Sequence, residues 1–140
     1  MGALGNDSKY GTNFGLKSEV VGARQKRAAG QAMEQRVRRW LERKGLSFVQ
    51  CNVSFKAGEI DLVMRDGDVL VFVEVRSRSR SHWGYAIETI DWRKQKTLLA
   101  AVSLYLAKFH RKAMPACRID VVTVDGNRVF CLRQSMVSIA

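Results

Sequence analysis

The segment that most constrains the fold is a pair of strand-like runs that meet at one tight turn. Residues 58–76 read GEIDLVMRDGDVLVFVEVR, and Asp66-Gly67 separates the two runs. Asp and Gly both tolerate the positive φ that a short hairpin turn requires, so the segment predicts an antiparallel hairpin. The core of the second run, VLVFVEV, is almost continuously apolar. Such a strand is usually covered on both faces and therefore central in its sheet.

The remaining elements follow from periodicity and from turn residues. Helical spacing predicts helices at 18–44 and 91–110, and strand-like runs fall at 48–56, 59–65, 68–76, 117–124 and 128–133. The order α-β-β-β-α-β-β predicts an α/β domain with a mixed sheet of about five strands flanked by two helices. The crossover through the second helix should make 117–124 parallel to 68–76. We expect residues 1–17 to form a flexible arm and residues 18–140 a single domain.

Composition narrows the function. Lysine and arginine number 24 against 13 acidic residues, a formal net charge of +11. This excess favours a polyanionic partner, nucleic acid before membrane. No apolar run approaches the ~20 residues of a membrane span. The cysteines Cys51, Cys117 and Cys131 are too widely spaced for a CxxC zinc site and do not form a disulfide framework, so we expect them to be reduced and the protein to be cytoplasmic.

Glu34 is an acidic residue on the expected apolar side of the first helix. At 100° per residue it lies about 20° from Leu41, and Gly30, one turn earlier, would let another backbone come close. A carboxylate directed at a core is costly unless it is paired with a cation or bound to a metal. Glu34 is therefore either one half of an ion pair with a strand arginine or part of a site.

Asp61 and Glu74 lie on the two strands of the hairpin, and Arg76 shares the face of Glu74. A turn centred on Asp66-Gly67 makes paired positions sum to about 133, which sets Asp61 opposite residue 72 and Glu74 diagonally beside it. Two carboxylates held close repel unless a proton or a divalent cation lies between them. Hard oxygen ligands favour Mg²⁺ or Mn²⁺. The alternative is a surface ion-pair cluster with Arg65, Arg76 and Arg78.

These motifs together resemble a known family. The hairpin is similar to the central hairpin of the PD-(D/E)XK restriction-endonuclease-like superfamily. The full pattern resembles the YraN-type family of bacterial nuclease-like proteins. It adds to the hairpin the segments Gly30-Gln-Ala-Met-Glu34, Trp40-Leu41, Lys94-Gln95 and Arg118-Ile-Asp-Val-Val. The resemblance spans most of the expected domain and implies a restriction-endonuclease-like core.

The resemblance also implies roles for individual residues. Asp61 and Glu74 would be ligands of Mg²⁺ or Mn²⁺, together with the backbone carbonyl of Val75. Glu34 matches the first-helix glutamate that archaeal Holliday-junction resolvases of the superfamily use at the metal site. The metal would polarise a phosphodiester and generate the attacking hydroxide. The implied function is a metal-dependent endonuclease that acts on DNA in preference to RNA, on structured or branched DNA above all. Junction-resolving relatives act as dimers, which leaves a homodimer open.

Arg76 is the departure that bears on activity, because it occupies the lysine position of the superfamily. Arginine stays charged and cannot act as a base, although it can still stabilise the charge of a reacting phosphate. The alternative function is therefore a catalytically inactive nucleic-acid-binding module with the nuclease fold. A third hypothesis, a small protein-interaction scaffold, explains the net charge poorly.

Further candidates lie outside the hairpin. Gln95 lies about 40° from Leu99, on the expected apolar face of the second helix, where a polar amide needs partners. It is either a satisfied amide between helices or, as the resemblance implies, directed at the site. Lys94 and Lys96 would contact phosphate. In the loop before this helix, Arg78, Arg80 and Trp83 could bind nucleic acid by charge and stacking or simply pack.

Arg118 and Asp120 share a face of the strand 117–124. The family pattern includes both residues. We interpret them as a structural ion pair rather than as catalytic groups.

Overall fold

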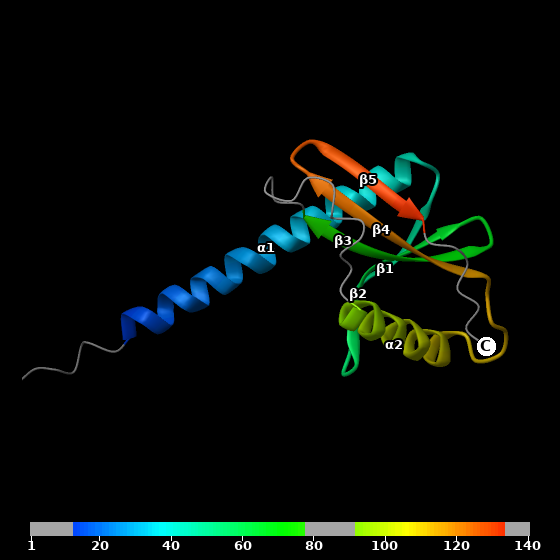
Figure 1. The fold of residues 1–140 in the computed structure, drawn as a ribbon, viewed down its shortest axis with the longest axis horizontal. Coiled ribbons are helices and arrows are strands. Elements are labelled where there is room, and N and C mark those ends of the chain that lie inside the picture. Colours follow the sequence, from blue (N-terminus) through cyan, green and yellow to red (C-terminus); the bar gives the residue numbers. More distant parts are fainter. Residues whose placement is uncertain (1–12, 78–91, 134–140) are drawn as a thin grey trace, which may run out of the picture. The chain divides into compact units, whose positions relative to one another are not determined.

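The computed structural model describes residues 13–77 and 92–133 (Figure 1). Two helices and five strands follow one another in the predicted order α-β-β-β-α-β-β. They are α1 (Asn13–Arg43), β1 (Ser47–Phe55), β2 (Gly58–Asp66), β3 (Val69–Ser77), α2 (Trp92–Phe109), β4 (Cys117–Asp125) and β5 (Arg128–Arg133). The strands and α2 agree with their expected bounds to within one residue at each end. The expected α/β fold class is confirmed.

The five strands form one mixed sheet in the order β1-β2-β3-β4-β5. β3 and β4 are parallel, as the crossover through α2 predicted, and the other neighbours are antiparallel. β3 lies in the middle of the sheet, and its residues from Leu70 to Glu74 are all buried. The near-continuous apolar run VLVFVEV is explained by this central position, because both of its faces are covered.

The register of the β2–β3 hairpin differs from the expected one by two residues. Asp66 pairs with Val69 and Leu62 with Val73, so paired positions sum to 135 rather than about 133. The turn is centred on Gly67-Asp68, and Gly67 takes the positive φ of 59° that the first turn position requires. A shift of two preserves which side chains share a face. It moves the expected partner of Asp61 from Phe72 to Glu74.

The core has two parts, one on each face of the sheet. On one face the side chains of α2 pack on β1–β4. On the other face the last turns of α1 pack on the sheet, with Val37 and Leu41 fully buried or nearly so. The α2-side cluster consists mainly of Val53, Ile60, Val63, Leu70, Phe72, Leu98, Ala101, Val102, Tyr105, Leu106, Cys117 and Ile119. The opposite cluster consists mainly of Val37, Leu41, Leu46, Leu62, Met64, Val71, Val73, Val122 and Val124.

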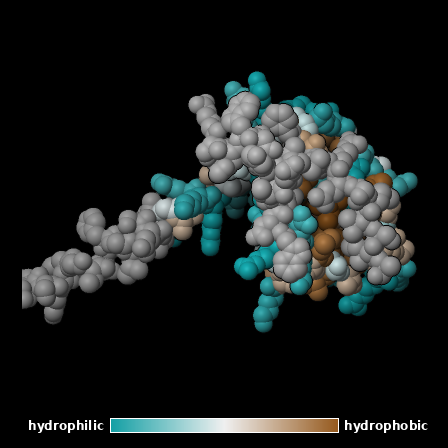
Figure 2. All heavy atoms as spheres, viewed as in Figure 1, coloured by the Kyte–Doolittle hydropathy of each residue, from teal (hydrophilic) through white to brown (hydrophobic). Residues whose placement is uncertain are grey.

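The chain divides into two compact units, Met1–Ala32 and Met33–Ala140. α1 begins at Asn13, five residues before the expected cap Ser18, so the helix includes part of the segment expected to be an arm. The rest of that segment, residues 1–12, lies outside the described residues. Within the first unit the described basic side chains Arg24, Lys26 and Arg27 are exposed. Hydrophilic side chains accordingly dominate the coloured surface of this helix (Figure 2).

Candidate acidic site

The candidate site lies where β2 and β3 stop pairing. The last pair of their ladder is Leu62 with Val73. Asp61 precedes Leu62 on β2 and so lies one residue farther from the turn. Its carboxylate accepts a hydrogen bond of 2.8 Å from the backbone N–H of Val75. The Asp61 side chain thus takes the place of a main-chain acceptor at the point where the ladder ends. The same register, extended by one pair, sets Asp61 opposite Glu74.

The alternation of side chains breaks at the same place. Leu62 packs in the α1-side cluster, yet Ile60, two residues away on the same strand, packs in the α2-side cluster. On β1, Cys51 and Val53 divide between the two clusters in the same way. Asn52, between them, has a positive φ of 51°. Such a residue inside a strand turns the following side chain toward the other face. Ile60 and Leu62 therefore lie on different faces, although regular strand alternation would place them on one.

Glu34 reaches this region from α1. Its carboxylate has a side-chain hydrogen bond with Asn52, while Oε2 is buried and makes no hydrogen bond within the described residues. Burial raises the pKa of Glu34, and the negative charges of Glu59 and Glu74 raise it further, whereas the hydrogen bond with Asn52 lowers it. Asn52 is therefore the neighbour that stabilises the charged form of Glu34. The groups that act on this carboxylate are Asn52, Glu59 and Glu74 rather than a strand arginine.

The pKa of Asp61 reflects both its burial and its neighbour Glu74. Burial raises the pKa of Asp61 to about 7, and the charge of Glu74 is the second cause. The hydrogen bond from Val75 opposes this rise, whereas Glu34 and a side-chain hydrogen bond with Glu74 add to it. The pKa of Asp61 is thus raised first by its removal from water and second by the negative charge of a neighbouring acid. The three carboxylates Glu34, Asp61 and Glu74 are called the acidic site below.

Two cations lie beside Glu74. Lys94 of α2 places Nζ 3.0 Å from Oε1 of Glu74, and Nε of Arg76 lies 4.0 Å from the same oxygen. The side chain of Glu74 is only 6% exposed, whereas that of Lys94 is 57% exposed. The Nε and Nη2 atoms of Arg76 are buried without a hydrogen-bond partner in the described part of the chain. An unpaired buried donor is costly, so these two nitrogens are donors that still lack an acceptor among the described residues.

The donor set suits a hard divalent cation in its chemistry. All three side chains supply carboxylate oxygens, one of which is buried without a partner, and their mutual repulsion would be relieved by a cation. However, among residues 13–77 and 92–133 no three His, Cys, Asp or Glu side chains already converge as a metal centre. If an ion binds here, Asp61 and Glu74 would provide a pair of oxygen ligands, and the shell would need further oxygens such as water.

The other expected site residues fall into two groups. Gln95 and Lys96 lie on the first turns of α2 and are exposed. Leu99, used to place Gln95 on the apolar side of the helix, is itself 40% exposed, so that inference of burial is wrong. Arg78, Arg80 and Trp83 lie outside the described residues.

Arg118 and Asp120 form the structural ion pair expected from the sequence. Nε of Arg118 donates to both oxygens of Asp120, at 3.1 and 3.2 Å, and Nη1 donates to Asp66 Oδ2 at 2.8 Å. Asp120 is 1% exposed. The guanidinium thus connects β4 to the β2–β3 turn and compensates a buried acid.

Sequence reasoning missed two residues that shape the site, Asn52 and Gly58. Asn is enriched among residues with positive φ, but a single Asn inside a strand-like run did not stand out. Gly58 lies against α2 so closely that a Cβ atom would come 2.5 Å from the backbone oxygen of Thr97. This approach sets the distance between the β1–β2 hairpin and the part of α2 that carries Lys94.

Comparisons with known proteins agree on one family. A family model described as "Uncharacterised protein family UPF0102" matches residues 33–124. A UPF0102 protein of Actinobacillus pleuropneumoniae is 47% identical over 104 residues, which cover 73% of this chain and 85% of that protein. Relatives from Haemophilus influenzae (49% over 98 residues, 69% and 82% covered) and Haemophilus ducreyi (43% over 107 residues, 75% and 85% covered) carry the same family name. These matches confirm the family resemblance inferred from the motifs.

Proposed function

The chain belongs to the UPF0102 family, and from the chemistry of its acidic site we propose that it is a metal-dependent endonuclease acting on structured or branched DNA. The observation that carries the proposal is the placement of Asp61 beside the buried Glu74, where the Val75 N–H holds the Asp61 carboxylate. Burial, followed by the charge of Glu74, raises the pKa of Asp61 to about 7, and an unpartnered oxygen of Glu34 lies buried nearby. A divalent cation satisfies this arrangement better than a proton does.

Mg²⁺ or Mn²⁺ would be held by Asp61, Glu74 and the backbone carbonyl of Val75, with Glu34 completing the shell. The ion would supply Lewis-acid activation of a phosphodiester and a hydroxide at neutral pH. The hydrogen bond from the Val75 N–H orients Asp61, and Asn52 orients Glu34. The protein residues thus hold their oxygens in place before the ion arrives, which limits the reorganisation needed at the moment of reaction.

The cations beside Glu74 have a second role in this proposal. Arg76 cannot remove a proton, but its unpaired buried nitrogens can bind the oxygens of a phosphate that is gaining negative charge. Lys94, mostly exposed and 3.0 Å from Glu74, would contact a neighbouring phosphate of the strand, as would Lys96. Gln95 would support the site from the same turn of α2.

The alternative is a nucleic-acid-binding module of the nuclease fold without turnover. Two observations favour it: arginine stands at the lysine position of the superfamily, and no three-ligand metal centre is already assembled among the described residues. DNA as the preferred polyanion, a homodimer and a cytoplasmic location remain parts of the proposal. The net charge of +11 supports the nucleic-acid partner in either case. Within the described residues no helix has both the length and the apolar character to cross a membrane.

Cleavage of a flapped or four-way-junction DNA with and without Mn²⁺ tests the proposal. We expect cutting that requires the metal and is lost in Asp61→Asn and Glu74→Gln, while binding of the same DNA, measured with chelator present, survives in both variants. Glu42→Gln is the matched control, because Glu42 is an exposed acid paired with Arg38 on α1. Equal DNA binding with and without metal and no cutting by the wild-type chain would support the alternative. Weak binding without a steep dependence on salt would exclude both.

A further inference from the structure

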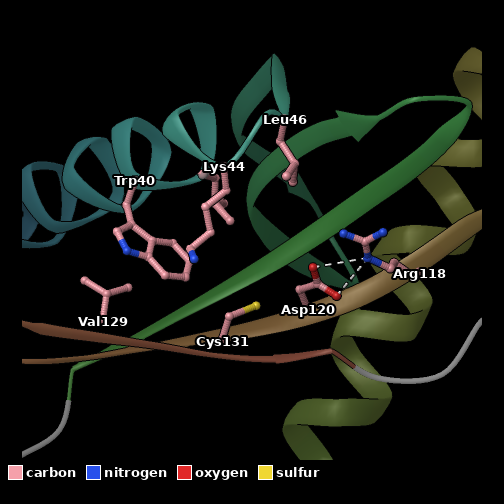
Figure 3. A pocket seen from close by; sticks show the side chains of 8 residues that line it. Trp40, Lys44, Leu46, Arg118, Asp120, Val129 and Cys131 are labelled. Atoms are coloured by element: carbon pink, nitrogen blue, oxygen red, sulfur yellow. Dashed lines mark hydrogen bonds and ion pairs between the residues drawn. The ribbon is translucent and has the colours of Figure 1, made fainter.

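A second site lies away from the acidic site, between the end of α1 and strands β4 and β5. It is a pocket of about 340 Å³ within the unit Met33–Ala140. Its lining residues are Trp40, Leu41, Lys44, Leu46, Arg118, Asp120, Val129 and Cys131. Figure 3 shows Trp40 of α1 and Lys44, the residue after α1, projecting toward Val129 and Cys131 of β5, with Asp120 and Arg118 of β4 at one end. The volume is at the lower end of the range for pockets that bind small organic ligands.

One side of the pocket can accommodate a flat ring. The half-buried indole of Trp40 forms part of the lining, and the buried side chains of Leu41 and Leu46 add apolar surface. Lys44 Nζ lies 4.6 Å from the centre of the Trp40 ring. Lys44 Nζ thus lies over the ring rather than at its edge, and aromatic rings with nearby cations are the side chains that proteins combine to stack nucleobases and to bind the phosphate backbone.

The other side offers a donor and an acceptor side by side. Asp120, a residue that is only 1% exposed, supplies carboxylate oxygens. Arg118 supplies Nη2, which is buried and makes no hydrogen bond within the described residues. The other two nitrogens of this guanidinium already have partners: Nε donates to Asp120 and Nη1 donates to Asp66. An adjacent donor and acceptor match the edge of a nucleobase, which carries both in fixed positions.

Charge selects a nucleotide over other aromatic ligands. Arg118 is balanced by the two aspartates it contacts, so Lys44 is the lining cation left to meet an anionic group. Arg39 and Arg43, on the same last turns of α1, are exposed. A phosphate at the pocket mouth would therefore meet positive charge while the base lies inside.

We propose that this pocket binds a single unstacked nucleotide. The base would stack on Trp40 and form hydrogen bonds with Asp120 and Arg118, and the phosphate would contact Lys44. That the nucleotide is part of a DNA strand rests on the proposed function. The binding of a nucleotide is independent of the proposed function, because none of the lining residues belongs to the acidic site.

Isothermal titration calorimetry in the presence of chelator tests this pocket. The probes are GMP, AMP, the corresponding nucleosides, inorganic phosphate and an eight-nucleotide single strand. We expect saturable binding of nucleotides that Trp40→Leu weakens by about ten-fold or more and Trp40→Phe preserves to within about three-fold, because stacking needs a ring. Lys44→Gln, an exposed substitution that leaves the core intact, should weaken nucleotides but not nucleosides.

The probes also separate the two sources of a nucleotide. Tighter binding of the single strand than of GMP or AMP would identify the ligand as part of a nucleic acid, and equal binding would identify a free nucleotide. No saturable binding of any nucleotide, or a loss that is equal in Trp40→Leu and Trp40→Phe, would overturn the proposal. Because chelator is present in every titration, metal at the acidic site makes no contribution, and the result stays separate from the proposed nuclease. Glu42→Gln, an exposed acid outside the lining of the pocket, should bind the probes like the wild-type chain.

Discussion

The backbone N–H of Val75 donates a 2.8 Å hydrogen bond to the carboxylate of Asp61, one residue beyond the last pair of the β2–β3 ladder. This bond holds a charged side chain at the place where two strands separate, next to the buried Glu74. The hydrogen bond stabilises the ionised form of Asp61, whereas burial and the negative charge of Glu74 destabilise it. The destabilising effects are larger, because the pKa of Asp61 rises to about 7.

The raised pKa of Asp61 predicts how stability depends on pH. Between its ordinary pKa of 3.8 and about 7, the folded chain keeps a proton that the unfolded chain has released. The free energy of unfolding should therefore fall as pH rises through this range and level off above it. The steepest slope should be of order 1 kcal/mol per pH unit. Asp61→Asn cannot ionise and should lose this part of the decline.

Urea denaturation midpoints of wild type and Asp61→Asn, measured in one buffer series between about pH 4.5 and about pH 8, check this prediction. Only the difference between the two proteins is interpreted, because Glu34 also has a raised pKa and contributes to both curves. Parallel curves for the two proteins would show that Asp61 ionises normally in the folded chain.

Asn52 provides a second prediction, which separates its backbone role from its side-chain role. Asn52→Gly and Asn52→Ala both remove the hydrogen bond with Glu34. Only alanine must also hold a side chain at the positive φ of 51°. The alanine variant should be less stable than the glycine variant by about 1 kcal/mol, as measured by chemical denaturation. Equal stability, or a more stable alanine variant, would mean that β1 relaxes to an ordinary strand at this residue.

The close approach of Gly58 to α2 predicts a large effect from one added methyl group. In Gly58→Ala, the Cβ atom would meet the Thr97 backbone oxygen at 2.5 Å, so α2 and the hairpin must move apart. We expect a loss of roughly 1–3 kcal/mol. Gly30→Ala is the matched control, because no atom lies within 4 Å of its added Cβ and alanine favours a helix. The close backbone approach expected at Gly30 from the sequence is therefore wrong. Thermal unfolding of both variants checks the prediction, and a Gly58→Ala protein as stable as Gly30→Ala would contradict the packing described here.

The order of elements and the sheet topology could be predicted because each depends on local signals. The run VLVFVEV indicates a central strand, Asp66-Gly67 and Asp125-Gly126 indicate turns, and a helix between β3 and β4 requires a crossover. The face shared by Glu74 and Arg76 follows from strand alternation, and it survived the two-residue register difference. The acidic pair on the hairpin was therefore accessible from sequence.

The remaining features depend on the twist and reach of the sheet, which local patterns do not encode. The break in alternation at Asn52 divides Ile60 and Leu62 between two core clusters, although their spacing indicates one face. A helical wheel places Gln95 on the same side of α2 as Leu99, but it does not show how far the sheet extends beneath them. Both side chains are exposed. The pocket beside Trp40 combines residues from α1, β4 and β5 that only the fold brings together.

A calorimetric titration with Mn²⁺ at about pH 7.5, where Asp61 is mostly ionised, tests the central claim most directly. The wild-type chain should bind the ion saturably and release only a fraction of a proton per ion, because Asp61 is already mostly ionised at this pH. Glu42→Gln should behave in the same way, and Asp61→Asn should lose most of the binding while remaining folded. Absence of saturable Mn²⁺ binding by the wild-type chain, or equal binding by Asp61→Asn, would contradict a metal site formed by Asp61 and Glu74.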